Sequence, residues 1–166
     1  MLDVGRHRRI DCATSEPITV ADLEATRAAQ RVEIQTGDVL LIRTGWLKSY
    51  TDETPQRRAE MADRNQLKAP GLAATEDMAA YLWDHHIAAV AADNPALEAW
   101  PPRAETGGFL HHRLIPLLGM PIGELWWLDD LAADCAADGR YEFFVTSAPL
   151  NMPGGVGSPP NALGLK

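Results

Sequence analysis

The sequence predicts an α/β fold in which at least some of the strands pair in parallel. Segments with helix-capping residues alternate along the chain with short, continuous apolar runs that are typical of buried strands. Parallel strands need crossover connections, which are usually helices, so this alternation favours parallel pairing. With 166 residues, 46% of them hydrophobic and 23% charged, the chain is expected to form one domain over residues 1–166.

The clearest helix–strand unit lies near the N-terminus. Thr19 and Asp22 form a capping pair, and residues 23–29 have the leucine and alanine content of a helix. A turn follows at residues 37–38, Gly-Asp. The next run, VLLIRTG at 39–45, consists largely of strand-forming residues and predicts a buried strand.

The middle of the chain combines a charged excursion with a second helix–strand unit. Residues 47–68 are rich in charge, so we expect them at the surface, partly helical over 56–62. Thr75 predicts the cap of a helix over 76–87, and AAVAADN at 88–94 predicts a short buried strand. The remaining predicted elements are a loop at 94–108, a helix at 109–118 stopped by Gly119, a strand at 122–128, a helix at 129–138 stopped by Gly139, a strand at 141–150 and a glycine-proline loop at 153–161.

Charge, hydropathy and cysteine content limit the function classes. The chain has 15 basic and 23 acidic residues and a net charge of −8, which disfavours nucleic acid or an anionic membrane as a partner. No apolar run approaches the roughly 20 residues that span a bilayer, and the N-terminus lacks the apolar core of a signal peptide. Cys12 and Cys135 form no CxxC motif, so we expect no thiolate zinc site and a cytoplasmic location.

Two adjacent histidines and a glutamate lie within GGFLHHRLIPLLGMPIGELWWL, residues 107–128. A helix from His112 to Leu118 climbs about 9 Å, and a strand after Gly119 returns by a similar distance, so His112 and Glu124 can meet. A neutral imidazole and a carboxylate suit Zn²⁺ or Mn²⁺, but catalytic zinc usually has three protein ligands. Spacing alone therefore favours a solvent-edge histidine and a surface glutamate over a metal site.

Other polar positions allow two interpretations. Asp93 and Asn94 follow a predicted strand, where α/β folds place their sites, but such residues also start turns there. His85 and His86 close a predicted helix, where capping explains them better than metal binding. The sequence has no Gly-x-Ser-x-Gly elbow, P-loop or His-Glu-x-x-His motif, so these patterns assign no catalytic residue.

Several stretches together resemble the C-terminal portion of the cyclase family, which includes kynurenine formamidase and isatin hydrolase. They are GDVLLIRTGW, AAVAADN and the run over residues 111–165. The most specific feature is the order of His112, Glu124 twelve residues later, and the motif PGG-x-GSP near the end. The resemblance covers nearly the whole chain from Leu2 onward.

This resemblance implies a swivelling β/β/α-type domain and arylformamidase-like hydrolysis of a small amide or lactam, an activity of tryptophan catabolism. In the family, a Zn²⁺ or Mn²⁺ ion activates the attacking water. His112 matches a metal-ligand histidine by position, because it directly precedes the Arg-Leu pair, and Glu124 matches a metal-ligand carboxylate. Trp46, Asp93 and His111 are expected in the wall of the substrate pocket.

The family motif His-x-Gly-Thr-His-x-Asp, which supplies most of the metal ligands, does not occur in this sequence. Three explanations stay open. The chain can be N-terminally truncated, or it can be part of a split enzyme whose partner chain supplies the missing ligands. It can also be a catalytically inactive homologue that acts as a scaffold or binding subunit. We expect a homo-oligomer, because an incomplete sheet exposes an edge that a second copy can cover.

Overall fold

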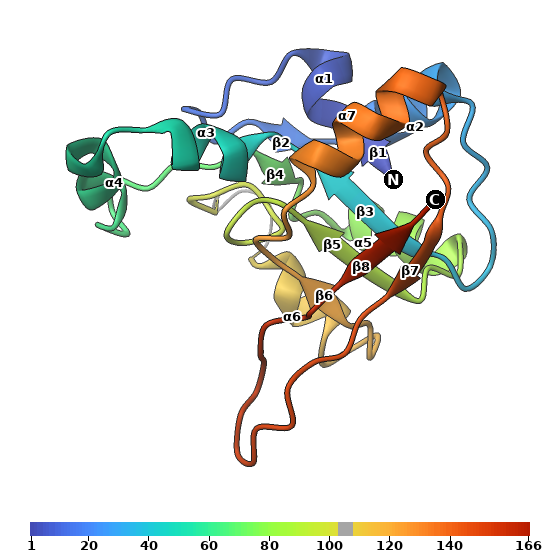
Figure 1. Cartoon of the computed structure of the whole chain (residues 1–166). Helices are drawn as coiled ribbons and strands as arrows, with labels where there is room; N and C mark the ends of the chain where they lie inside the picture. The colour runs from blue at the N-terminus through green and yellow to red at the C-terminus, as the bar shows by residue number, and fades with distance from the viewer. Residues whose placement is uncertain (103–107) are drawn as a thin grey trace.

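A computed structural model describes residues 1–102 and 108–166 of the chain. Its main sheet has four strands in the order β1-β3-β5-β6, and every neighbouring pair is parallel (Figure 1). The predicted α/β fold with parallel strands is therefore confirmed. The four strands are β1 (Leu2–Asp3), β3 (Val39–Arg43), β5 (Ala89–Ala92) and β6 (Ile122–Gly123).

The two central strands, β3 and β5, are buried on both faces. Successive side chains of a strand point to opposite faces, so a strand covered on both sides is continuously apolar. The sequences VLLIR and AVAA meet this requirement. One core contains Leu40, Ile42, Val90 and Ala92, and the core on the other face contains Leu41 and Ala91.

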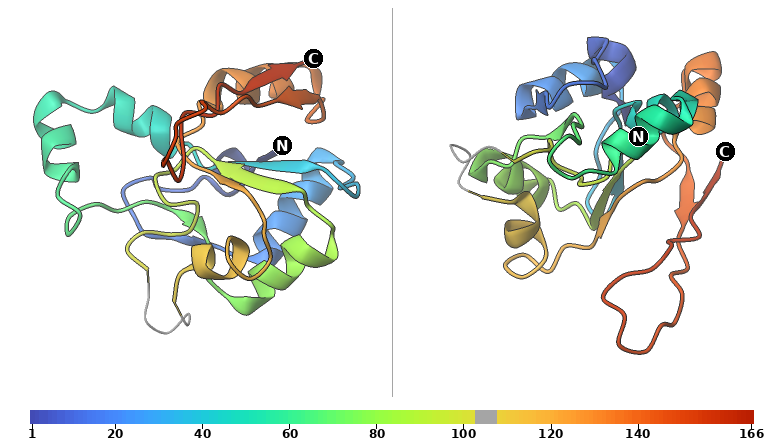
Figure 2. Two further views of the ribbon diagram at one scale, coloured as in Figure 1. Left: turned by 90° about the horizontal axis from the view of Figure 1, so that it is seen from below. Right: turned by 90° about the vertical axis from the view of Figure 1, so that its left-hand side faces the viewer.

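Helices pack on both faces of the sheet (Figure 2). The first core is closed by side chains of α1 (Val4–Arg8), α2 (Val20–Gln30), α5 (Glu76–Asp84) and α6 (Leu110–Leu114). The second core is closed by α7 (Asp129–Asp138). Because α7 lies on the opposite side of the strands from α2 and α5, the molecule has three layers in this region.

Local capping chemistry sets the starts of the main helices, as predicted. The Asp22 backbone N–H donates to Thr19 Oγ1 at 3.3 Å, and the Thr19 N–H donates to Asp22 Oδ2 at 2.7 Å, which completes a capping box for α2. The Thr75 hydroxyl accepts from the Met78 N–H at the start of α5. Gly139 ends α7 in the left-handed region, with φ at 75°.

The charged excursion over residues 47–68 contains two short helices. They are α3 (Trp46–Asp52) and α4 (Pro55–Met61). Thr54 caps α4, and Pro55 occupies its first position, where the missing N–H costs no hydrogen bond. None of the α4 side chains is buried, so this segment contributes little to the core.

Three predicted elements differ from the structure. The helix predicted over 109–118 is α-helical only at Leu110–Leu114 and continues as turns. The strand predicted over 122–128 ends after Gly123, because the chain turns through Leu125, whose φ is +55°. The strand predicted over 141–150 is only β7 (Phe144–Thr146), and it does not join the main sheet.

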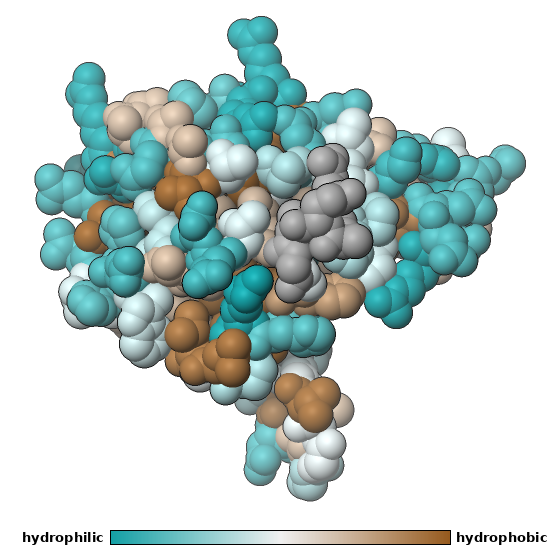
Figure 3. Space-filling view, turned by 180° about the vertical axis from the view of Figure 1, so that it is seen from behind, coloured by the Kyte–Doolittle hydropathy of each residue, from teal (hydrophilic) through white to brown (hydrophobic). Residues whose placement is uncertain are grey.

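β7 instead pairs in antiparallel register with β8 (Leu163–Leu165) and forms a separate hairpin. We name residues 144–165 the C-terminal arm. The long loop of this arm projects from the body (Figure 1), and the space-filling view shows apolar residues on this projection (Figure 3). Leu150, Met152 and Val156 of the arm are exposed.

No helix in the described ranges, 1–102 and 108–166, is long and apolar enough to cross a membrane.

A second small sheet fixes the loop that follows β5. In this sheet β2 (Pro17–Ile18) pairs in parallel with β4 (Gly71–Leu72). A Cβ atom added at Gly71 would lie 2.4 Å from both Asn94 Nδ2 and the carbonyl carbon of Glu98. Because these are a buried amide and a backbone atom, the neighbours cannot move aside cheaply.

We therefore expect Gly71→Ala to lower the free energy of unfolding by about 2–3 kcal/mol, the range for overpacking a well-filled site. Urea unfolding followed by circular dichroism measures the change. Gly157→Ala is the matched control, because a Cβ atom at Gly157 would meet no atom within 4 Å. Equal unfolding midpoints for the two variants would show that the packing around Gly71 is looser than described.

Candidate functional site

A cavity of about 930 Å³ lies between the main sheet and the C-terminal arm. β5 and β6 form one wall, which includes Ile122, and the arm forms the other wall, which includes Leu150 and Met152. His111 and Glu124 are the ionisable side chains among the described residues that line it. An apolar cavity of several hundred Å³ with few polar groups is typical of a small-molecule site.

The imidazole of His111 lies between two carboxylates. His111 Nδ1 is 2.8 Å from Glu98 Oε2, and His111 Nε2 is 3.2 Å from Glu124 Oε1. Glu98 is fully buried, whereas the side chain of Glu124 is 35% exposed. Hydrogen bonds to Glu124 and then to Glu98 raise the pKa of His111 to about 9.

The register of α6 explains why Glu124 meets His111. Leu110 and Leu114 are both fully buried and one turn apart, so they define the core face of the helix. His112 is about 200° around the helix from Leu110 and points away from the core, whereas His111 is about 100° around and lies on the flank. His112 is accordingly exposed, and its ring lies 5.4 Å from the ring of Phe109.

The structure thus brings Glu124 to His111, whereas the spacing predicted an approach to His112. The predicted contact between His112 and Glu124 is not the one that forms. His112 as a metal ligand stays a prediction. His111 lines the cavity, and its place in the wall of a substrate pocket stays a prediction.

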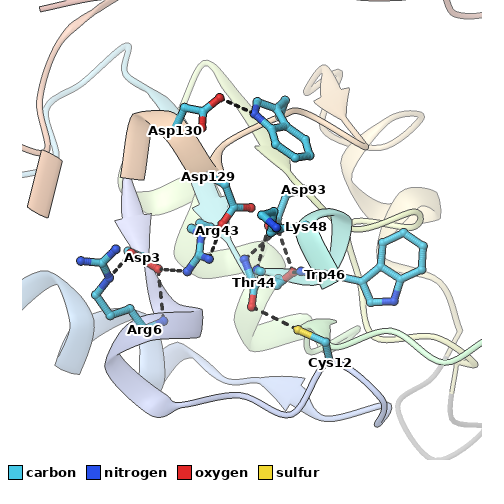
Figure 4. Close-up of polar contacts among 12 residues, drawn as sticks. Asp3, Arg6, Cys12, Arg43, Thr44, Trp46, Lys48, Asp93, Asp129 and Asp130 are labelled. Carbon is cyan, nitrogen blue, oxygen red and sulfur yellow. Dashed lines mark hydrogen bonds and ion pairs between the residues drawn. The ribbon is translucent and has the colours of Figure 1, made fainter. Parts of the chain in front are cut away.

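Asp93 connects the carboxyl ends of β3 and β5 (Figure 4). Its carboxylate accepts hydrogen bonds from the Thr44 N–H, the Thr44 hydroxyl and the Gly45 N–H, each at 2.7 Å. Burial raises the pKa of Asp93, and these hydrogen bonds oppose that rise. Asp93 is fully buried and is not among the residues that line this cavity, so its predicted place in a substrate pocket stays a prediction.

Trp46 also lies away from the cavity. Its indole N–H donates to the Lys68 carbonyl oxygen at 2.9 Å, and its ring stacks on Tyr50 with 5.2 Å between centroids. The residue is 4% exposed. Trp46 therefore anchors α3 and the excursion to the body instead of lining the cavity.

A separate ion-pair cluster lies next to Asp93 in the same view (Figure 4). Arg43 Nη1 is 2.8 Å from Asp3 Oδ1, and Arg43 also pairs with Asp129 at the start of α7. The cluster ties β1, β3 and α7 together. Because Asp3 and Asp129 both neutralise Arg43, we assign this cluster to the fold.

Glu98 lies in a segment that the sequence predicts to be a loop, and no motif gives it a role. Its main chain forms a bridge with Leu72 of β4, and its carbonyl oxygen accepts from Asn94 Nδ2 at 3.2 Å. These contacts bring a buried carboxylate against α6. The available signal in the sequence was a single acidic residue inside an apolar segment, ALEAW at 96–100.

The donor set can be compared with what a metal requires. No group of three or more His, Cys, Asp or Glu side chains that could hold a metal occurs within the described part of the chain. Glu98 and Glu124 contact opposite nitrogens of His111, so they face different sides of the ring. His111 Nε2 and the Glu124 carboxylate remain as a mixed nitrogen and oxygen pair, which suits Zn²⁺ or Mn²⁺ but is incomplete alone.

The fold and the cavity define an α/β domain with one candidate small-molecule site, and comparison with known proteins adds the family. The family described as "Putative cyclase" matches residues 1–99. The chain also resembles a crystal structure of a novel cyclase, with a TM-score of 0.85 and 39% sequence identity over 99% of this chain. This chain belongs to the cyclase family.

The extent of these matches matters for the site. The chain spans about half of the solved relative, because the match covers 52% of that relative's chain. The match to the family ends at residue 99, so His111 and Glu124 lie beyond it, although both lie within the structural match. No curated protein matches the chain.

The contacts of His111 with Glu98 and Glu124 lead us to predict that the stability of the fold depends on pH. The folded-state pKa of His111, about 9, lies above the ordinary histidine value of 6.5, so protonated His111 stabilises the folded chain. This contribution is fully present below about pH 6.5 and is lost as the pH rises through about 9. We expect the urea midpoint of the wild type to fall over this range more than that of His111→Gln. Parallel pH profiles would contradict the described contacts of His111.

Proposed function

We propose that this chain is part of a metal-dependent hydrolase that opens a small amide or lactam in an arylformamidase-like reaction. Membership of the cyclase family and the 39% identity to a solved cyclase support this proposal. The observation that carries it is the pair of His111 Nε2 and Glu124 Oε1, 3.2 Å apart at the cavity. Two ligand atoms bound to one tetrahedral zinc at about 2.0–2.1 Å are separated by about 3.3 Å.

His111 and Glu124 would hold the ion, which would activate a water molecule for attack on the substrate carbonyl. The remaining walls are mainly apolar, so they would bind an apolar or aromatic substrate. Glu98 would keep its contact on the far side of the His111 ring, away from the substrate. His112, the ligand that the sequence predicted, is the alternative partner for Glu124 and needs a different α6 register to reach it.

The missing ligands are part of this proposal. A catalytic zinc usually has three protein ligands, and the described residues provide two. The chain corresponds to about half of its solved relative, so further protein can complete the site. We propose that a partner chain or additional polypeptide supplies the other ligands at the open side of the cavity.

A second candidate function is a metal-free, homo-oligomeric scaffold or binding subunit. The exposed apolar side chains of the C-terminal arm favour it, because such a surface is typical of an interface. Val156 at the loop of the arm is fully exposed. In this case the cavity would bind a ligand or a second copy without chemistry.

Metal content and hydrolysis distinguish the two candidates. The purified chain is equilibrated with Zn²⁺ or Mn²⁺, passed through a desalting column and analysed for metal. It is then assayed against an N-formyl arylamine and an aryl lactam. The hydrolase proposal predicts that the chain retains metal through His111 and Glu124, and that the ring-opened or deformylated product is released once the missing ligands are supplied. A chain that retains no metal supports the scaffold instead.

A further inference from the structure

We propose that Glu98 is a positioning residue that holds the His111 ring with Nε2 toward Glu124 and the cavity. This inference rests on the proposed function for its consequence, metal affinity. The orientation itself can be measured without a metal. No sequence motif assigns Glu98 a role.

The two carboxylates around His111 differ in their access to the cavity. The side chain of Glu98 is 0% exposed, and that of Glu124 is 35% exposed. Glu124 lines the cavity, whereas Glu98 lies behind the ring and does not. Glu98 therefore cannot serve as a ligand in the cavity without displacing the ring that it contacts. Its position suits an acceptor for the Nδ1–H of His111, at 2.8 Å.

The main chain around Glu98 is fixed on both sides. The Leu72 N–H donates to the Leu97 carbonyl oxygen at 2.9 Å, and the Ala99 N–H donates to the Leu72 carbonyl oxygen at 3.0 Å. Asn94 Nδ2 contacts the carbonyl oxygens of both Leu97 and Glu98 at 3.2 Å. These contacts tie the main chain at Glu98 to β4, and the fully buried side chain places its carboxylate against the His111 ring.

A fixed acceptor on Nδ1 has a defined effect on an imidazole. A neutral imidazole carries one proton, and a carboxylate beside Nδ1 keeps the proton there, which leaves the Nε2 lone pair free. A metal-binding histidine commonly donates its other ring N–H to such a carboxylate, and loss of that partner reduces metal affinity by about 10–100-fold. In this site Nε2 faces Glu124, and the proton that Nε2 carries in the protonated imidazole is released to solvent when a cation binds.

The orientation is tested by NMR on protein with ¹⁵N-labelled histidine. In the metal-free wild type we expect a downfield, slowly exchanging proton on His111 Nδ1. Glu98→Ala should lose this signal, and Glu98→Gln should keep a weaker one, because the amide oxygen can still accept. His112→Ala and Glu60→Ala are controls that leave the signal unchanged, since Glu60 is a surface residue paired with Arg57.

Zinc titration by calorimetry supplies the second readout. Relative to the wild type, we expect the zinc dissociation constant to rise by about 10–100-fold in Glu98→Ala and by less in Glu98→Gln. Circular dichroism establishes that each variant is folded. Because glutamine matches the size of glutamate, Glu98→Gln keeps the test valid if the alanine variant unfolds.

The outcomes separate this inference from the proposed function. A folded Glu98→Ala chain that keeps the Nδ1 proton signal, or binds zinc as the wild type does, overturns the positioning role. If the signal depends on Glu98 but the wild type binds no zinc, the positioning role stands and the metal-dependent function fails. If the signal depends on Glu98 and zinc affinity falls with it, both are supported.

Discussion

Replacing Asp93 with alanine is expected to lower the free energy of unfolding by about 3 kcal/mol or more. The substitution removes the acceptor of three hydrogen bonds and leaves the N–H groups of Thr44 and Gly45 without their described partner. A buried donor that loses its acceptor costs about 1–3 kcal/mol. Asp93→Asn should cost less, because one oxygen remains to accept from Thr44. Urea unfolding followed by tryptophan fluorescence measures both changes.

Asp52→Ala is the matched control for this experiment. Asp52 is exposed and forms an i, i+4 pair with Lys48, so its loss should change stability by no more than about 0.5 kcal/mol. If Asp93→Ala were as stable as Asp52→Ala, the hydrogen bonds between β3 and β5 would not have the assigned role. That result would favour the prediction that Asp93 lies in the wall of the substrate pocket.

The second large effect concerns metal affinity. His111→Ala and Glu124→Ala are each expected to weaken zinc or manganese binding by at least about 100-fold, because each removes one of two ligands. His112→Ala should bind like the wild type, since the exposed His112 ring lies against Phe109 and forms no described contact with Glu124. Calorimetric titration of the three variants with the same metal stock measures the difference.

His112→Ala is also the internal control, because it removes an imidazole one position away. The opposite pattern, with affinity lost in His112→Ala and kept in His111→Ala, would restore the ligand that the sequence predicted. Equal affinity in all three variants would place any metal elsewhere in the chain.

The sequence predicted the parts of the fold that depend on neighbouring residues. The capping box of Thr19 and Asp22 and the apolar runs of β3 and β5 are local patterns, and each appears where predicted. The predicted bounds of the strands at 122–128 and 141–150 were wrong, because both strands are shorter in the structure. Residues 141–150 have strand-forming composition, but pairing decides a strand, and only Phe144–Thr146 find a partner, in β8. That partner lies far along the chain, so no local pattern reveals it.

The candidate site was predicted only in part, because some of its contacts join segments that are distant in the sequence. The spacing placed His112 opposite Glu124, but in the structure the neighbouring His111 contacts Glu124. Choosing between the two histidines required the core face of the helix, which Leu110 and Leu114 define and which the sequence already contains. A helical projection of these leucines would have favoured His111 over His112.

Glu98 could not have been found in this way. It reaches His111 because β4 and Asn94 hold the loop after β5, a contact between segments that are separate in sequence. The sequence places Asp93 at the end of a strand, but this position alone cannot distinguish a residue of a site from a residue that starts a turn. Its hydrogen bonds to Thr44 and Gly45 support a role in joining β3 to β5.

The central claim is that His111 and Glu124 form the metal-facing pair of the cavity. Anomalous diffraction at the zinc absorption edge, from crystals of zinc-equilibrated protein, tests it most directly. We predict an anomalous peak bonded to His111 Nε2 and a Glu124 carboxylate oxygen, each at about 2.0–2.2 Å. A peak at His112, or no peak beside Glu124, would contradict the claim.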